Sequence, residues 1–236
     1  MRDILQLAFK EYRWFQPAPD SRFGEYEDLT PGTINYGARL AYYDEVRQLT
    51  ITDRTEEEFL IISTSRRTEF PFVGRISFSI AVDAPNTAGW RDSHLHQVVE
   101  LMRRVGSYLA QAGMIDDVYR KEDRFIPNPD GIGTEQTFTL RDPSEGLTGL
   151  MWRNFFGPPF IRMFGDRLQL LPPACQRELG NDLVLVQPYE LPTQAMTPGG
   201  DAAEARLITV LGPECFYDHQ QHRKPTRVPE LALPST

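Results

Sequence analysis

The chain has 236 residues, of which 40% are hydrophobic and 11% aromatic, enough for a packed globular core. Its formal net charge is −8, so its overall field does not attract nucleic acid or an anionic membrane surface. The chain therefore lacks the positive charge that binds strongly acidic partners, and its negative charge is compatible with a basic protein partner.

The cysteines and the N-terminus indicate the compartment. Cys175 and Cys215 are too few for a disulfide scaffold, and free thiols suit a reducing compartment. The first apolar run is short and interrupted by Gln6, unlike a secretory signal. No stretch of the sequence approaches the roughly 18 apolar residues that a membrane span needs. We therefore expect a soluble, cytoplasmic protein without a membrane partner.

Hydrophobic periodicity predicts one helix and two strands in the first part of the chain. Residues 3–15 are ambiguous, and the Pro- and Gly-containing residues 16–33 are typical of a loop. Residues 34–49 fit a helical period. Residues 59–62 form a continuous apolar run, typical of a buried strand, whereas residues 75–82 alternate apolar and polar side chains, as a half-buried strand does.

The middle of the chain contains the clearest helical pattern. Over residues 93–112, apolar side chains recur three and four positions apart, and Gly113 can end the helix. Residues 116–133 are first charged and then rich in Pro and Gly, which predicts a loop. Residues 134–140 have the alternation of a strand.

Residues 149–172 are the densest apolar and aromatic segment of the chain. Large aromatic side chains bury the most area per residue, so this segment predicts the structural hub against which other elements pack. The hub residues are Trp152, Phe155, Phe156, Phe160 and Phe164.

Short elements are predicted after the hub. Residues 172–179 begin with two prolines and stop before Gly180, which favours a short helix. Residues 183–186 are apolar on both faces, as in a central strand, and residues 188–200 are typical of a loop.

The last predicted helix covers residues 202–211. Asp201 can cap its start, with Glu204 completing a pair like a capping box, and Gly212 can end it. From about residue 218 the chain is polar and rich in Pro, which predicts a partly extended tail. Helices and strands mix without a βαβ rhythm and without internal repeats. The sequence therefore predicts a single α+β domain over residues 1–236, with a mixed or largely antiparallel sheet packed against helices.

Histidine spacing does not predict a metal site. His94 and His96 lie at the start of a predicted helix, where residues two apart diverge by about 200° and cannot hold one ion. His219 and His222 lie in the polar tail, and a zinc site needs three or four ligands. We therefore interpret the histidines as surface residues and expect no metal and no cofactor.

Catalytic motifs are not readable either. The sequence contains no nucleophile elbow and no phosphate-binding loop, and its two cysteines are interpreted as structural thiols. A restriction-type nuclease core needs a Pro-Asp pair and then an acid, one spacer and a lysine. After Pro129-Asp130 and Glu135, the lysine position holds Thr137. No residue is assigned a catalytic role.

Acidic side chains cluster at several places in the chain. One interpretation is a solvated surface; the other is a patch complementary to a basic partner, which would speed association. The candidates for such a contact are Glu56, Glu57, Glu58, Asp116 and Asp117.

The hub also carries a family resemblance. Residues 152–160 read WRNFFGPPF, a second Phe-Gly pair follows at 164–165, and Leu-Pro at 171–172 precedes Gly-Asn-Asp-Leu at 180–183. This pattern, most visible over residues 135–215, resembles the bacterial immunity proteins that accompany polymorphic and type VI secretion toxins. The resemblance is to the TsiT-like group, the antidotes to effectors with a restriction-endonuclease-type nuclease domain.

The resemblance implies a non-enzymatic, cytoplasmic protein that binds a cognate toxin and covers its active or substrate-binding surface. It brings no catalytic residue, metal or cofactor to this chain. Two alternatives stay open, namely an adaptor or chaperone that loads an effector onto secretion machinery, and a hydrolase with unrecognised acidic catalytic residues. Homo-oligomer formation also stays open.

Overall fold

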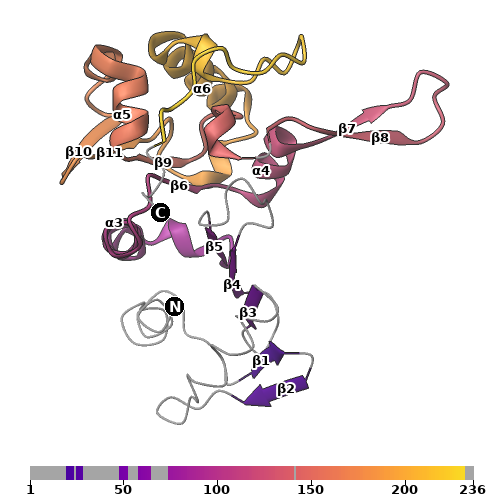
Figure 1. The fold of residues 1–236 in the computed structure, drawn as a ribbon, viewed down its shortest axis with the longest axis vertical. Helices are drawn as coiled ribbons and strands as arrows, with labels where there is room; N and C mark the ends of the chain where they lie inside the picture. The colour runs from indigo at the N-terminus through magenta and orange to yellow at the C-terminus, as the bar shows by residue number, and fades with distance from the viewer. Residues whose placement is uncertain are drawn as a thin grey trace. The chain divides into compact units, whose positions relative to one another are not determined.

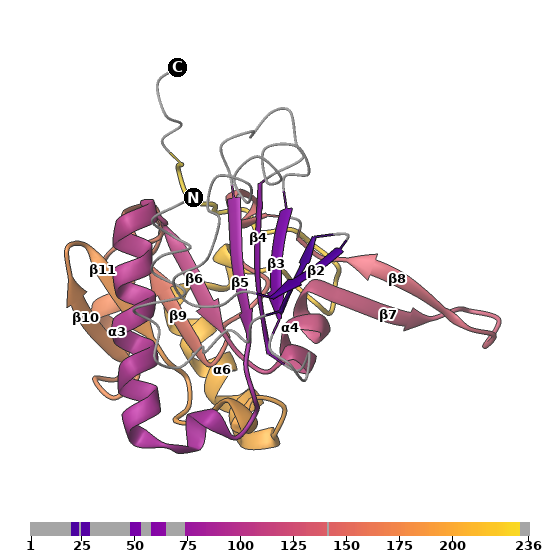
Figure 2. The same cartoon turned by 90° about the horizontal axis from the view of Figure 1, so that it is seen from below.

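The computed structural model describes residues 20–23, 25–28, 48–52, 58–64, 74–140 and 142–231 (Figures 1 and 2). Contacts divide the chain into two compact units, Met1–Gln97 and Val98–Thr236. The predicted single domain over residues 1–236 stays a prediction.

The first unit contains an antiparallel sheet with the strand order β2-β1-β3-β4-β5. Its strands are β1 (Asp20–Phe23), β2 (Glu25–Asp28), β3 (Gln48–Thr52), β4 (Phe59–Thr64) and β5 (Gly74–Ser79). The side chains of Leu60 and Ile62 are buried, and they pair across the ladder with Phe78 and Ile76. The apolar run at 59–62 and the alternation at 75–82 therefore correspond to β4 and β5.

The predicted helix at 34–49 is wrong at its C-terminal end. Residues 48 and 49 belong to β3, which pairs with β1 and β4. The loop predicted at 16–33 is wrong where the structure describes it, because residues 20–23 and 25–28 form β1 and β2. The rest of that loop, the rest of the helix and the ambiguous segment 3–15 lie outside the described residues.

The helix predicted at 93–112 is shifted toward the N-terminus. Helix α3 (Ala88–Val105) follows a short 3₁₀ turn, η1 (Ala84–Asn86), and ends seven residues earlier than the apolar spacing indicates. Gly106 adopts a left-handed conformation with φ 65°, and the Ser107 N–H donates to the Met102 carbonyl at 2.9 Å. These are the features of a Schellman C-cap, which closes the helix before residue 109.

The second unit is built on a four-stranded antiparallel sheet in the order β10-β11-β9-β6. Its strands are β6 (Leu109–Ala112), β9 (Arg153–Phe156), β10 (Gln176–Gly180) and β11 (Leu183–Val186). All four side chains of β9 and all four of β11 are buried, as expected of central strands. The antiparallel sheets and the helices together confirm the α+β prediction.

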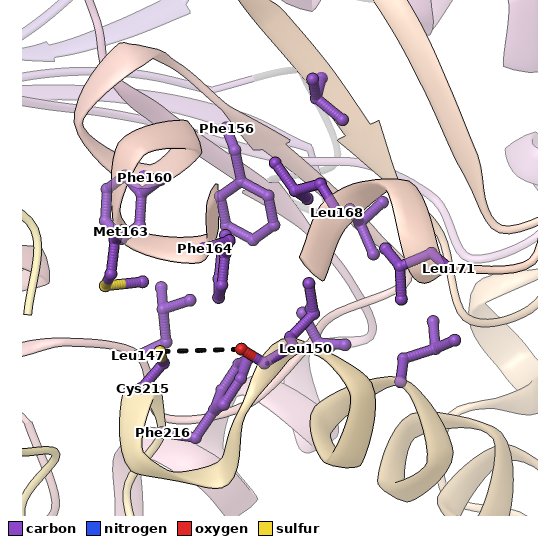
Figure 3. Packing of buried hydrophobic residues seen from close by; sticks show 14 residues of the cluster. Leu147, Leu150, Phe156, Phe160, Met163, Phe164, Leu168, Leu171, Cys215 and Phe216 are labelled. Carbon is purple, nitrogen blue, oxygen red and sulfur yellow. Dashed lines mark hydrogen bonds between the residues drawn. The ribbon is translucent and has the colours of Figure 1, made fainter. Parts of the chain in front are cut away.

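The hub segment connects strand β9 of this sheet to the helices that pack on one face of it. Strand β9 is followed by α5 (Pro158–Phe164) and the 3₁₀ helix η3 (Gly165–Leu170), and α5 lies on the same face of the sheet as α6 (Pro198–Leu211) (Figure 1). All five aromatic hub residues are buried. The Phe156 ring lies 5.5 Å from that of Phe160 and 5.1 Å from that of Phe164, and these rings form the centre of the core with side chains from the η5 turn (Pro213–Cys215) and Phe216 (Figure 3).

Two predictions after the hub are corrected by turn and cap chemistry. The predicted helix at 172–179 is instead a turn followed by β10, because Asn181 and Asp182, both at positive φ, reverse the chain into β11. Helix α6 begins at Pro198 rather than at residue 202. Its cap is Thr197, whose hydroxyl accepts the Gly200 N–H at 3.1 Å. The predicted loop at 188–200 thus holds the start of α6 and the turn η4 (Pro192–Gln194).

The loop predicted at 116–133 is also wrong. It contains α4 (Ile115–Glu122) and β7 (Asp123–Pro127), and β7 pairs with β8 (Thr134–Phe138) in a two-stranded hairpin. The hairpin extends beyond α4 and points away from β9 and α6 (Figures 1 and 2). None of the helices in the described part of the chain is long and apolar enough to cross a membrane.

Candidate partner-binding surface

A buried ion network fixes α4 in the second unit. The Lys121 side chain is 6% exposed, and its Nζ lies 2.8 Å from Asp117 Oδ2 and 2.8 Å from Glu204 Oε2. It also donates to the Leu150 carbonyl at 2.6 Å, so all three ammonium protons have an acceptor. A charge can be buried when it is paired and fully hydrogen-bonded in this way.

Arg120 continues the network to the surface. Its Nη2 contacts Asp117 Oδ1 at 2.7 Å, and its Nη1 contacts Asp201 Oδ1 at 2.9 Å. Burial acts to lower the pKa of Arg120, but the hydrogen bonds that it donates to Asp201 and Asp117 outweigh this effect and raise the pKa. We call Asp117, Arg120, Lys121, Asp201 and Glu204 the ion clamp, because these side chains tie α4 to α6.

The clamp leaves little space around it. A Cβ atom on Gly149 would lie 2.7 Å from Glu204 Oε1 and 3.1 Å from Lys121 Cδ. Glu204 Oε1 also accepts the Leu150 N–H at 3.0 Å. Glu204 therefore anchors the start of the hub segment and does not complete a capping box on α6. A side chain at position 149 would therefore press on the clamp, which glycine avoids.

The candidate acidic residues differ in their burial and in their contacts. Asp117 is fully buried and paired with Lys121 and Arg120, so its carboxylate is not available to a partner, and its inclusion in the binding set is wrong. Asp116, one residue earlier on α4, is exposed. Glu58 is half-buried in the other unit and accepts the Ala81 N–H at 3.0 Å. Glu56 and Glu57 lie outside the described residues.

Exposed apolar side chains recur along the segment that contains Asp116. We call α4, β7, the turn and β8, residues 115–138, the arm. It contributes four of the nine large apolar side chains that the described residues expose, namely Ile115, Tyr119, Phe125 and Ile132. Phe125 is 64% exposed and Ile132 is 77% exposed. Single exposed apolar residues are ordinary, but four of them in one short segment make that segment a candidate binding surface.

The outer part of the hairpin has one face without charged side chains. Its register pairs Phe125 with Gln136 and Pro127 with Thr134, and residues paired across strands share a face. All four of these side chains are exposed. This face presents the Phe125 ring beside Gln136 and Pro127, and its only charged position in the register is Asp123 at the base of the hairpin.

Charge on the arm is acidic where it is exposed. Asp116, Asp130 and Glu135 are exposed, whereas the one exposed cation, Arg120, is held by Asp117 and Asp201. The arm therefore combines an apolar surface with negative charge, a combination that fits a basic protein surface.

The base of the hairpin is attached to the C-terminal segment. The Arg124 guanidinium donates to the His219 carbonyl, and the His219 ring contacts the Thr148 carbonyl through Nε2 at 2.5 Å. Burial lowers the pKa of His219, and the nearby cations Arg124, Lys121 and Arg120 lower it further against the effect of the Thr148 carbonyl. His219 is therefore a partly buried structural residue and not the surface histidine that the sequence predicts.

Sequence reasoning missed the arm although a turn signal was present. Asn128-Pro129-Asp130-Gly131 has the residue types of a tight turn between two strands. Gly131 and Gly133 both have positive φ, and the Asn128 N–H donates to the Gly133 carbonyl at 3.2 Å. Helix α4 was also missed, because five of its eight residues are charged and few apolar positions show its helical period.

The remaining candidate groups are structural in the residues that the structure describes. His94 is buried and its ring stacks on Trp90 with centroids 5.0 Å apart, so it is not a surface residue either. Burial raises the pKa of the Cys215 thiol to about 11. Within the described ranges no group of three or more His, Cys, Asp or Glu side chains is placed to hold a metal ion.

The WRNFF part of the motif that carries the family resemblance lies in the core. Asn154 is fully buried, and its amide bonds the Met151 backbone N–H and carbonyl, the Val186 carbonyl and the Gln111 side chain. A Cβ on Gly157 would lie 3.0 Å from Tyr108 Cα. Asn154 and Gly157 are therefore needed for packing and close backbone approach, whereas Asn181 and Asp182 of the motif lie in an exposed turn.

Searches against protein-family models, curated protein sequences and solved structures found no match to this chain.

Proposed function

We propose that this chain is an immunity protein that binds and neutralises a cognate secreted toxin, a nuclease effector of a type VI secretion system. It would act in the cytoplasm by covering the active or substrate-binding surface of the toxin. The observation that carries the proposal is the arm, which exposes Phe125 and Ile132 together with the carboxylates of Asp116, Asp130 and Glu135. The resemblance of the hub motif supports the assignment to immunity proteins.

Electrostatics supports this choice of partner. A nuclease holds the phosphates of its substrate with Lys and Arg, so its substrate-binding surface is basic. A chain of net charge −8 is attracted to that same surface, and the attraction mainly raises the association rate. Exposed apolar side chains then supply affinity once the two surfaces meet.

The rest of the second unit fits the role of a scaffold. The aromatic hub and the Asp117, Lys121 and Glu204 side chains of the ion clamp are buried, and each of their polar groups named above is matched by another group of the chain. The proposal assigns the chain no catalytic residue, metal or cofactor; its activity is binding.

The experiment pairs the purified chain with the toxin encoded beside it. Calorimetry should show a complex, and DNA cleavage by the toxin should stop once the chain is present in equal amount. A nuclease toxin from an unrelated pair is the control and should keep its activity. Absence of binding to the adjacent toxin would refute the proposal. Binding that leaves the toxin fully active would point to effector loading instead.

A further inference from the structure

The outer edge of β8 is available for backbone pairing. In the described residues β8 pairs with β7 and with no other strand, and Thr134, Glu135 and Gln136 are all exposed. An unpaired strand edge presents N–H and C=O groups that can bond a further strand. Proteins commonly block such an edge with a proline, a lysine or a bulge, and β8 (TEQTF) contains none of these.

The ladder shows which β8 groups point outward. The Asn128 N–H donates to the Gly133 carbonyl and the Thr139 N–H donates to the Glu122 carbonyl, at the two ends of the same register. In an antiparallel pair, bonded and non-bonded residue pairs alternate. Counting inward from either end makes Phe125 and Gln136 a non-bonded pair. The N–H and C=O of Gln136 therefore point away from β7.

The edge of β7 is less suited to pairing. Pro127 occupies a non-bonded position of the same register, where its nitrogen faces outward and has no hydrogen to donate. The β8 edge is therefore the competent one, and it is flanked by the exposed apolar side chains of Phe125 and Ile132.

We propose that the toxin docks by adding one of its exposed strands to the outer edge of β8, with basic side chains near Glu135 and Asp130 and apolar groups against Phe125 and Ile132. This inference rests on the proposed function and names the part of the chain that carries it. Backbone bonds would supply register and affinity, while the exposed carboxylates select a basic strand.

The sharpest variant is Gln136→Pro. It removes an N–H that faces outward and keeps the bonds between β7 and β8, so the hairpin should persist as edge prolines allow. The matched control is Gln136→Ala, which alters the side chain and keeps the N–H. Gln136→Pro should weaken toxin binding by about tenfold or more, and Gln136→Ala by less than about twofold. Equal binding by both variants would overturn the proposal.

The side-chain contacts have their own matched pair. Phe125→Ala combined with Ile132→Ala should weaken binding by about tenfold or more. Leu170→Ala removes a comparably exposed apolar side chain outside the arm and should leave binding unchanged. Circular dichroism and thermal melts of every variant show that the fold is kept. An effect of Leu170→Ala as large as that of the arm variant would overturn the assignment.

Hydrogen exchange on the wild-type complex needs no variant, so its result does not depend on whether a variant folds. The Thr134 and Gln136 amides should become protected when the toxin binds, and protection confined to other segments would overturn the proposal. A dimer of the isolated chain that Gln136→Pro dissolves would assign the edge to a second copy and would overturn it too. Failure of the wild type to bind the toxin refutes the proposed function itself, whereas wild-type binding with unaffected arm variants refutes this inference alone.

Discussion

At the scale of single residues, the aromatic core is the most sensitive part of the chain. Phe156 is fully buried and its ring packs against Phe160 and Phe164. Phe156→Ala should lower the free energy of unfolding by about 3–5 kcal/mol, because it removes buried area and leaves a cavity. Urea unfolding measures it, with the exposed Leu170→Ala as control. A loss below about 1 kcal/mol would mean that this ring is not a core residue.

Gly149 is sensitive for a different reason. A Cβ there would press on Glu204 Oε1 at 2.7 Å, so Gly149→Ala has to displace part of the ion clamp. We expect it to lower the free energy of unfolding by about 1–3 kcal/mol. The matched control is Gly89→Ala, where a Cβ meets no atom within 4 Å and alanine suits the helix. Similar melting temperatures for the two variants would contradict the tight packing at position 149.

His219 should make stability depend on pH. Its pKa is lowered from 6.5 in the folded chain, chiefly by burial, so the unfolded chain binds a proton more readily. Stability is then complete above pH 6.5 and falls as the pH decreases from 6.5 toward the lowered pKa. His219→Gln should flatten this part of the curve in urea melts taken between about pH 7 and 5. A wild-type and a variant curve of equal slope would exclude His219 as the source.

At the scale of elements, helix α6 depends on its cap. The Thr197 hydroxyl accepts the Gly200 N–H, and Pro198 occupies the first turn. Thr197→Ala should lower the free energy of unfolding by about 1 kcal/mol, because a helical N–H loses its acceptor. Thr193→Ala, at an exposed position in the preceding turn, is the control. Thermal melts decide the result, and equal effects of both variants would exclude the cap.

Strands were predictable where one physical signal dominates. The run at 59–62 and the alternation at 75–82 are set by burial of one or both faces, which the sequence displays directly. The helix at 93–112 was misplaced because Leu109 continues the apolar spacing of α3 by coincidence, whereas the glycine at 106 ends the helix.

The candidate site was less predictable than the fold. Asp116 and Asp117 are adjacent acids of equal appearance, yet one is exposed and the other is buried by Lys121, four residues on, and by Arg120. Telling them apart requires α4 to be recognised as a helix, since only the helical period places residues 117 and 121 together. Apolar residues such as Phe125 and Ile132 also give no sign in sequence that they face solvent.

At the scale of the whole molecule, negative charge should govern the speed of association. Reversing Glu56, Glu57 and Glu58 together to Lys, or Asp116 alone, should slow toxin association by up to about tenfold at low salt and reduce its salt dependence. Asp117→Lys is unsuitable for this test because that side chain is buried. Stopped-flow rates at two salt concentrations provide the measurement. If every reversal leaves the association rate and its salt dependence unchanged, the electrostatic prediction is wrong and the apolar groups of the arm carry the affinity.

The turn of the arm holds itself together. The Asn128 side chain donates to the Ile132 carbonyl at 2.8 Å, and Asp130 Oδ1 accepts the Ile132 N–H at 2.9 Å. No described bond of this turn reaches the hub or the clamp, so substitutions in it leave the packing of the second unit intact. A lineage of such chains can therefore drift in this turn and exchange one adversary for another while inheriting the same core, since the turn and the clamp residues of α4 occupy different positions of the arm.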